Sequence, residues 1–185
     1  MLDIHEGVIK IDGLDISKIP LNILRTSGSI IPQDTLLFNG TIRENLDPSG
    51  VSTDEQLWSA LEQAHLKDVD SEINAGQYLS GGQKQLFSLA RAILQKSCFL
   101  IMDEATSNLD KEFEQILMST AQKLFHGKTL LIIAHRLSTV LDCDRIIVLD
   151  RGRIVEDGSP SILLNRNCGI FSAMVKSSEE GFLVP

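Results

Sequence analysis

Two acidic residues and a histidine stand at the ends of apolar segments, where they could act on a phosphate. Asp103 and Glu104 follow the run Cys98–Met102, and His135 follows Thr129–Ala134. Asp103 could hold Mg²⁺ through water, since this ion prefers one or two carboxylates together with phosphate oxygens. Glu104 could polarise a water for in-line attack on a terminal phosphate, and His135 could contact the departing phosphate. The alternative is that the acids cap the next segment and the histidine ends a strand in solvent.

A second candidate site is Ser80-Gly81-Gly82-Gln83, which precedes an apolar helical pattern. Glycines let a backbone approach a ligand closely, and a helix N-terminus attracts anions. A phosphate there would gain about 0.3–1 kcal/mol from the helix dipole, in addition to bonds with amides and the Ser80 hydroxyl. The alternative is an ordinary turn in which Ser80 caps the helix. Gln33 is likewise open to two interpretations, as a site residue or as an exposed turn residue.

A third glycine-containing sequence, Gly127-Lys128-Thr129, is a false match to a phosphate-binding loop. Gln122 stands where such a loop needs its first glycine, and a strand pattern follows where the loop needs a helix. We therefore interpret it as a turn between a helix and a strand. No G-x-x-x-x-G-K-[ST] sequence occurs elsewhere in the chain.

The elements that must position these residues alternate along the chain. The apolar runs Cys98–Met102 and Thr129–Ala134 show no polar alternation, and a helical pattern over about Glu112–Phe125 separates them. This arrangement predicts a parallel sheet covered by helices on both faces. Ligands bind beyond the carboxyl ends of such strands, so the acids and the histidine are expected to meet at one edge.

Shorter patterns predict the remaining elements of one compact α/β body. Asp12-Gly13 between two short apolar segments predicts a hairpin, and Gly28–Ile31 predicts a further strand. Ser52 or Thr53 opens a capping box before an amphipathic helix, in which Trp58 is expected to lie in the core. Two more strands are expected on either side of a later Arg-Gly turn, over Arg145–Leu149 and Arg153–Glu156.

Composition limits the classes of protein that remain. The chain has 185 residues, of which 43% are hydrophobic, and 17 basic against 25 acidic residues give a net charge of −8. This balance argues against a nucleic-acid partner but permits a nucleotide site. Cys98, Cys143 and Cys168 are odd in number and widely spaced, which predicts free, buried thiols in a reducing compartment. No apolar run approaches the roughly 20 residues of a membrane-spanning helix, and no signal segment is expected at the start.

Together these features resemble the nucleotide-binding domain of an ABC transporter. Five motifs stand in the order of that family, namely the Q-loop glutamine (Gln33), the signature motif (Leu79–Gln83), the Walker B strand (Phe99–Glu104), the D-loop (Ser107–Asp110) and the switch histidine (His135). The stretches Gly40–Pro48 and Leu57–Leu61 resemble the multidrug-resistance-associated branch, subfamily C. Second domains of that branch often have valine where this chain has Gly81.

The resemblance implies a P-loop NTPase-like fold, with a mostly parallel sheet, helices on both faces and a small helical subdomain. The subdomain would span 47–95, and the α/β core would comprise 1–46 and 96–185. It also implies ATP and Mg²⁺ as cofactors, and a head-to-tail dimer with a second nucleotide-binding domain. Transmembrane domains would hold the chain at the cytoplasmic face of a membrane, expected to be the plasma membrane. The implied activity is ATP hydrolysis that powers export of organic anions or xenobiotics.

The family's roles transfer to matching residues. The resemblance implies that Glu104 is the general base, Asp103 the carboxylate beside magnesium, and His135 the sensor of the γ-phosphate. Gln33 would touch the metal or the attacking water and relay the state of the site to the membrane domain. The motif Ser80, Gly81, Gly82 and Gln83 would serve the ATP of the opposite subunit, and Asp110 would cross the interface.

The chain departs from the family pattern in two places. It has no phosphate-binding loop, and Met1–Ile4 resembles the tail of the helix that follows that loop. It is therefore expected to resemble a domain without its N-terminal third and to be inactive alone. The segment between Lys67 and Leu79 is also shorter than usual. Two alternatives stay open, a non-catalytic truncated module that lends its signature motif to a partner, and a soluble ABC ATPase without a transport role.

Overall fold

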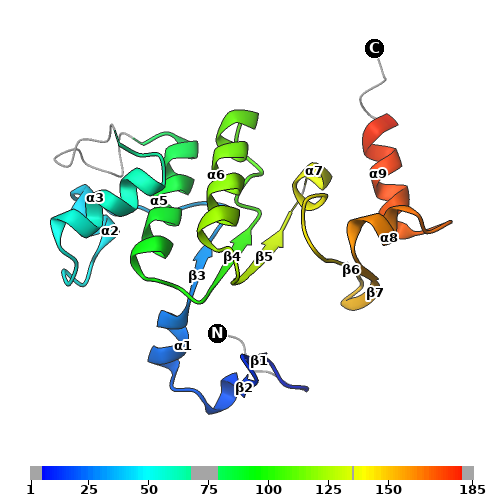
Figure 1. The fold of residues 1–185 in the computed structure, drawn as a ribbon, viewed down its shortest axis with the longest axis horizontal. Coiled ribbons are helices and arrows are strands. Elements are labelled where there is room, and N and C mark those ends of the chain that lie inside the picture. The colour runs from blue at the N-terminus through cyan, green and yellow to red at the C-terminus, as the bar shows by residue number, and fades with distance from the viewer. Residues whose placement is uncertain (1–5, 68–78, 135, 181–185) are drawn as a thin grey trace. The chain divides into compact units, whose positions relative to one another are not determined.

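The computed structural model describes residues 6–67, 79–134 and 136–180 of the chain (Figure 1). The chain divides into two compact units, Met1–Leu131 and Ile132–Pro185. The single body expected from the sequence, with a core over 1–46 and 96–185 and a helical subdomain over 47–95, stays a prediction. The short segment between Lys67 and Leu79 lies outside the described residues. In the part of the chain that is described, no helix has the length and apolar character needed to cross a bilayer.

A short antiparallel hairpin of β1 (Lys10–Ile11) and β2 (Leu14–Asp15) opens the described chain. Asp12 and Gly13 connect the strands with positive φ angles of 49° and 79°. Two successive positive φ angles define a type I′ turn, for which Asp-Gly is a favoured sequence. The predicted hairpin is therefore confirmed. The chain continues through a 3₁₀ turn, η1 (Ile16–Lys18), and helix α1 (Leu21–Ser27).

The central sheet has the strand order β3-β4-β5, with β3 (Gly28–Ile31), β4 (Phe99–Asp103) and β5 (Thr129–Ile133). β3 and β4 are parallel, and their pairing extends from Gly28 opposite Phe99 to the last residue of β3. All three strands coincide closely with segments predicted from the sequence. The parallel pair and the intervening helices confirm the α/β class.

Helices α5 (Gly81–Leu94) and α6 (Lys111–Leu124) pack against each other, and α5 also packs against β3 (Figure 1). The apolar face of α5 is buried as its periodicity predicts, and Phe87 and Leu89 are fully inaccessible to solvent. On β4, Leu100 and Met102 are buried. Burial of each such side chain stabilises the fold by about 1.5–3 kcal/mol relative to exposure, and the packing of α5 on β3 holds this helix against the sheet.

Two further helices, α2 (Ile42–Leu46) and α3 (Asp54–Gln63), each begin with a capping box. Thr53, rather than Ser52, is the cap of α3, and its partner is Gln56. Trp58 on α3 is 43% exposed, so the expectation that it lies in the core is wrong. Its neighbour Leu57 lies on the buried face. Consecutive helical residues point about 100° apart, which carries the indole of Trp58 away from that face.

The described residues of the second unit form a second hairpin and the helices α7, α8 and α9, with the bounds α7 (Leu137–Val140), β6 (Ile146–Asp150), β7 (Arg153–Gly158), α8 (Pro160–Leu164) and α9 (Ile170–Glu180). β6 and β7 are antiparallel, and Arg151 and Gly152 connect them with φ angles of 46° and 74°. The strands predicted on either side of this turn are confirmed. Ile146, Leu163 and Phe171 form the buried core of the unit.

The three cysteines are free thiols, as their number and spacing predict. Cys98 and Cys168 are exposed, however, so the expectation of burial is wrong for these two. Cys98 lies in the connection just before β4, and Cys168 lies in the turn before α9. At these positions neither side chain belongs to the packed face of a helix or strand. Cys143 is half-buried, and burial raises the pKa of its thiol, with further repulsion from Asp144 and Asp142.

Candidate functional site

Gln33 and the loop after β4 meet at the carboxyl edge of the parallel strands. The pairing of β3 with β4 continues to the last residue of β3, so the two strands end at the same edge of the sheet. The Gln33 side chain donates a hydrogen bond to the Ser107 hydroxyl, with 3.3 Å between Nε2 and Oγ. The structure therefore brings the Gln33 side chain to the loop that follows Asp103 and Glu104.

Glu104 has an unusual backbone conformation at this edge. Its φ angle is 48°, in the left-handed region that few residues other than glycine adopt. Its carbonyl accepts a hydrogen bond from the Ser107 amide at 3.0 Å, and Ala105 and Thr106 are buried beside it. The Glu104 side chain is half-buried, whereas Asp103 is exposed. Such a conformation costs about 1–3 kcal/mol, but the hairpin residues Asp12 and Arg151 share it, so by itself it assigns no role to Glu104.

The oxygen donors at this edge suit Mg²⁺. Asp103 presents an exposed carboxylate at the last residue of β4, and Gln33 presents an exposed side-chain amide beyond β3. Mg²⁺ keeps several waters and takes one or two carboxylates plus substrate phosphates, in preference to a cage made wholly of protein. A single carboxylate with an amide oxygen nearby fits that preference.

His135, the third group expected at this edge, lies outside the described residues. The strand that precedes it, β5, is the neighbour of β4 in the order of the sheet. The meeting of His135 with the two acids, and its contact with a phosphate, therefore stay predictions.

Ser80 caps α5 through a reciprocal pair of hydrogen bonds with Gln83. The Ser80 hydroxyl oxygen accepts from the Gln83 amide at 3.2 Å, and Gln83 Oε1 accepts from the Ser80 amide at 2.9 Å. The interpretation of Ser80 as a helix cap is thus confirmed. A hydroxyl that accepts one bond still has a proton to donate. Because Ser80 is exposed at the positive end of a 14-residue helix, the same corner can also present donors to an anion.

The two glycines of this corner have different surroundings. A Cβ atom on Gly82 would lie 2.4 Å from the ring of Phe113 on α6, so the absence of a side chain lets the two helices approach. A Cβ atom on Gly81 would meet nothing within 4 Å. Gly81 is therefore the position at which a ligand from outside could approach the backbone, and a Cβ atom there would not clash with the rest of the described chain.

Asp110 caps the neighbouring helix, α6. Its Oδ1 accepts a hydrogen bond from the Phe113 amide at 2.9 Å, and its side chain is exposed. The ring of the same Phe113 lies against Gly82. One aromatic residue therefore connects the predicted D-loop with the predicted signature corner. A role for Asp110 across an interface stays a prediction.

Gln85 is a residue of this region that the sequence did not indicate. It is 4% exposed, and its Nε2 donates to the carbonyls of Pro32 at 3.0 Å and Gln33 at 2.6 Å. Its Oε1 accepts from the Thr35 hydroxyl at 3.1 Å. The signal in the sequence was a glutamine on the buried face of α5, which is otherwise apolar except for Ser88. Helical periodicity shows that such a residue is buried, but its partners lie about fifty residues away along the chain.

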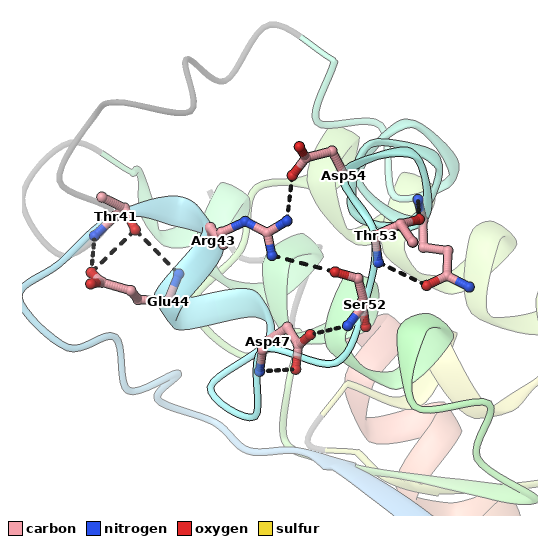
Figure 2. A network of polar contacts seen from close by, with 9 residues as sticks. Thr41, Arg43, Glu44, Asp47, Ser52, Thr53 and Asp54 are labelled. Atoms are coloured by element: carbon pink, nitrogen blue, oxygen red, sulfur yellow. Dashed lines mark hydrogen bonds and ion pairs between the residues drawn. The ribbon is translucent and has the colours of Figure 1, made fainter.

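A polar network joins α2 to α3 (Figure 2). Arg43 forms an ion pair with Asp54 and donates to the carbonyl of Ser52 at 3.4 Å. Asp47, at the end of α2, accepts from the Ser49 hydroxyl at 2.5 Å and from the Ser52 amide at 2.7 Å. These bonds, the one from Ser49 first, lower the pKa of Asp47 from its ordinary value of 3.8 to about 2.

A mostly apolar groove of about 330 Å³ runs between the same two helices. Its lining residues are Thr41, Ile42, Arg43, Leu46, Asp54, Leu57, Trp58 and Leu61. Trp58 thus forms part of the wall of this groove and is not enclosed by the core. The ion pair of Arg43 with Asp54 supplies charged groups to the same wall.

Comparisons with known proteins show the family to which the chain is similar. The family model described as ABC transporter matches residues 1–107. The mouse protein "ATP-binding cassette sub-family C member 10" is 46% identical over 189 residues, which covers 98% of this chain and 13% of that protein. The structure of a bacterial Atm1-family ABC exporter with ATP bound is 36% identical, with a TM-score of 0.86, over 96% of this chain and 33% of the exporter. The chain therefore spans a minor part of the length of these relatives.

Proposed function

Because this chain belongs to the nucleotide-binding domains of the ABC transporter family, subfamily C, we propose that it takes part in the ATP hydrolysis that drives an exporter. The observation that carries the proposal is the edge at which Gln33 contacts the loop that follows Asp103 and Glu104. This edge combines a carboxylate for a metal, a second acid with a positive φ angle, and an amide that contacts Ser107 in the loop after both acids. Such a set suits hydrolysis of a terminal phosphate.

Glu104 is the proposed general base, which takes a proton from the water that attacks the γ-phosphate. Its half-buried position limits competition from bulk water. Asp103 and Gln33 would hold Mg²⁺, which neutralises charge on the phosphates when bound. His135 is the proposed contact to the γ-phosphate, on the resemblance of its motif alone.

The Ser80 corner is proposed to serve a nucleotide held by a second nucleotide-binding domain in a head-to-tail dimer. Support comes from the exposed Ser80 hydroxyl, the open space at Gly81 and the positive end of α5. Gln83 stabilises the conformation of this corner, because its Oε1 accepts a hydrogen bond from the Ser80 amide. Asp110 is exposed beside the same region and is proposed to cross the interface.

The transport step is proposed from the family. The chain would act at the cytoplasmic face of a membrane, where transmembrane domains of the transporter bind it, and the plasma membrane is the proposed location. Organic anions or xenobiotics are the proposed cargo, in keeping with subfamily C. Similarity to exporters supports this proposal over a soluble ATPase without a transport role.

The substitution Glu104→Gln in the complete transporter tests the proposed function. We expect ATP binding to be retained and kcat for ATP hydrolysis to fall at least about 100-fold, because the amide cannot accept the proton. Glu112→Gln, an exposed glutamate in the first turn of α6, is the matched control and should leave kcat unchanged. Hydrolysis by the Glu104 variant within about threefold of the parent would remove Glu104 from the role of base.

A second candidate function follows from the absence of a G-x-x-x-x-G-K-[ST] loop in these 185 residues. In that case the polypeptide is a non-catalytic module that supplies only its Ser80 corner to the ATP of a partner. Size-exclusion chromatography of this polypeptide with a hydrolysis-deficient nucleotide-binding domain would test it. Co-elution that requires ATP and is lost on Ser80→Arg supports the module, and independent elution with ATP contradicts it.

A further inference from the structure

A glutamine side chain at each of two places on α5 forms hydrogen bonds with the segment around β3. At its C-terminal end, Gln95 Nε2 donates to the carbonyls of Arg25 and Thr26, both at 3.2 Å, and Oε1 accepts from the Ser29 hydroxyl at 3.1 Å. Nearer its N-terminus, Gln85 likewise donates to two carbonyls and accepts from one hydroxyl, that of Thr35. Each glutamine thus fastens two consecutive peptide groups to the helix.

The two contacts differ in what they fasten. Gln95 is exposed and holds the last turn of α1 together with the Ser29 side chain of β3, a residue whose position the pairing with β4 already fixes. Gln85 is buried and holds the peptides of Pro32 and Gln33, which lie beyond the end of the strand and have no ladder partner on β4. The Thr35 hydroxyl is also within 2.9 Å of the Ser88 hydroxyl, one helical turn further along α5.

The backbone that Gln85 holds belongs to a residue at the proposed catalytic edge. Gln33 accepts from Gln85 through its carbonyl and donates through its side chain to Ser107, three residues after Glu104. Gln85 is itself only two residues after Gln83, within the first two turns of the helix that Ser80 caps. A continuous set of contacts therefore runs from the Ser80 corner through Gln85 and Gln33 to the Glu104 loop.

We infer that Gln85 is a positioning residue, which fixes Gln33 at the catalytic edge relative to the Ser80 corner of the same chain. The inference rests on the proposed function, in which Gln33 serves the chain's own nucleotide and the Ser80 corner serves the partner's. Through Gln85 a displacement of α5 at one nucleotide is transmitted to Gln33 at the other. Gln85 touches neither nucleotide and acts only through the position of Gln33.

Steady-state ATP hydrolysis by the complete transporter tests the inference with two substitutions. Gln85→Leu removes all three hydrogen bonds, and Gln85→Glu keeps the shape while it replaces the donor with an acceptor. We expect kcat to fall about 10- to 100-fold in both, since a displacement of about 1 Å at a reacting group has such an effect. The KM for ATP should stay within about twofold, because Gln33 acts on the reacting groups and not on ATP binding. At lower pH, protonation of the introduced carboxyl restores one donor, so the Gln85→Glu defect should shrink.

Gln95→Leu is the matched control, because it removes the same three kinds of hydrogen bond from the same helix. We expect it to leave kcat and the KM for ATP unchanged. Hydrogen exchange followed by mass spectrometry should show faster exchange over residues 33–38 in the Gln85→Leu variant only. An equal fall in kcat for both variants, or unchanged kcat and exchange in the Gln85 variants, would overturn the inference.

The design also separates this inference from the proposed function. If the parent transporter hydrolyses ATP no faster than the Glu104→Gln variant, the proposed function fails, whatever the Gln85 variants do. Parent hydrolysis that depends on Glu104 but not on Gln85 leaves the proposed function in place and removes the positioning role. The exchange measurement does not depend on ATP hydrolysis, so it reports on the contact of Gln85 with the Gln33 segment in either case.

Discussion

At the scale of single residues, Gly81 and Gly82 show how one motif serves packing and recognition at adjacent positions. Both lie in the first turn of α5. Gly82 faces the Phe113 ring of α6, and Gly81 faces open space. The chemistry that the sequence suggests, close approach of a ligand to backbone, can therefore apply to Gly81. Gly82 is required by the contact between the two helices whether or not a ligand binds.

Substitution of these glycines by alanine should separate the two roles. Gly82→Ala should lower the free energy of unfolding by about 1–3 kcal/mol, because the new methyl group displaces the Phe113 ring. Gly81→Ala should be neutral or stabilise by up to about 1 kcal/mol, because alanine is the better helix former. Urea unfolding followed by circular dichroism measures both.

A double substitution identifies the cause of the Gly82 effect. Phe113→Ala removes the ring that the methyl group would strike, so Gly82→Ala should cost much less in that background. Equal costs with and without the Phe113 ring would show that the clash is not the reason for the loss.

At the scale of elements, the seven-residue connection from α2 to α3 is held by a carboxylate and not by an apolar contact. Asp47 is 7% exposed and accepts bonds from Ser49, Gly50 and Ser52. Both helices also carry their own capping boxes, at Thr41 and Thr53. The connection is therefore defined by hydrogen bonds that depend on the ionised form of one acid.

This dependence predicts a specific sensitivity to acid. The folded-state pKa of Asp47 is about 2, below the ordinary value of 3.8, so the unfolded chain binds more protons between these values. The stabilisation from Asp47 is complete above pH 3.8 and is lost as the pH falls towards 2. We expect the unfolding midpoint of the parent to decline more steeply across this range than that of Asp47→Asn.

Thermal unfolding between pH 2 and pH 6 measures this difference. Asp34→Asn is the control, since Asp34 is exposed in the loop after β3. Parallel curves for the parent and the Asp47 variant over the whole range would contradict the assigned role of the carboxylate.

At the scale of the whole molecule, the 185 residues contain Asp103 and Glu104 at the carboxyl edge of the sheet, and the Ser80 corner, but no phosphate-binding loop sequence. In the described part of the chain, β3 and β5 are the outer strands of the central sheet, and Ile30 and Leu131 on them are 61% and 50% exposed. Exposed apolar strands at a sheet edge favour association with other chains. The 185 residues thus contain the groups proposed for catalysis but no phosphate-binding loop sequence.

Without a phosphate-binding loop, the isolated 185-residue polypeptide is expected to bind nucleotide weakly. A phosphate-binding loop provides several charge-assisted hydrogen bonds of about 1.5–3 kcal/mol each. The loss of only two such bonds lowers the affinity for ATP more than about 100-fold. Titration with a fluorescent ATP analogue should show no saturable binding below millimolar concentrations. Saturation at micromolar ATP analogue, abolished by an excess of ATP, would contradict this.

Local patterns in the sequence were sufficient for most elements and for part of the site. The Asp12-Gly13 hairpin, β3, β4 and the cap at Ser80 each follow from residues within a few positions of one another. The contact of Gln33 with the loop after β4 did not follow from local patterns, which left Gln33 open between a site residue and an exposed turn residue. The exposure of Trp58 was missed, because the periodicity of a helix shows a face but not whether another layer covers it.

The sequence by itself determined the class of fold, the order of the motifs and the kind of chemistry, since these depend on residue type and short spacing. Tertiary structure alone decided that Gly82 is a packing residue, that Glu104 has a left-handed backbone and that Gln85 holds Gln33. Each of these depends on groups that are distant in the chain and close in space. Their contacts come from how helices and strands pack, and no local preference of the residues themselves specifies that packing.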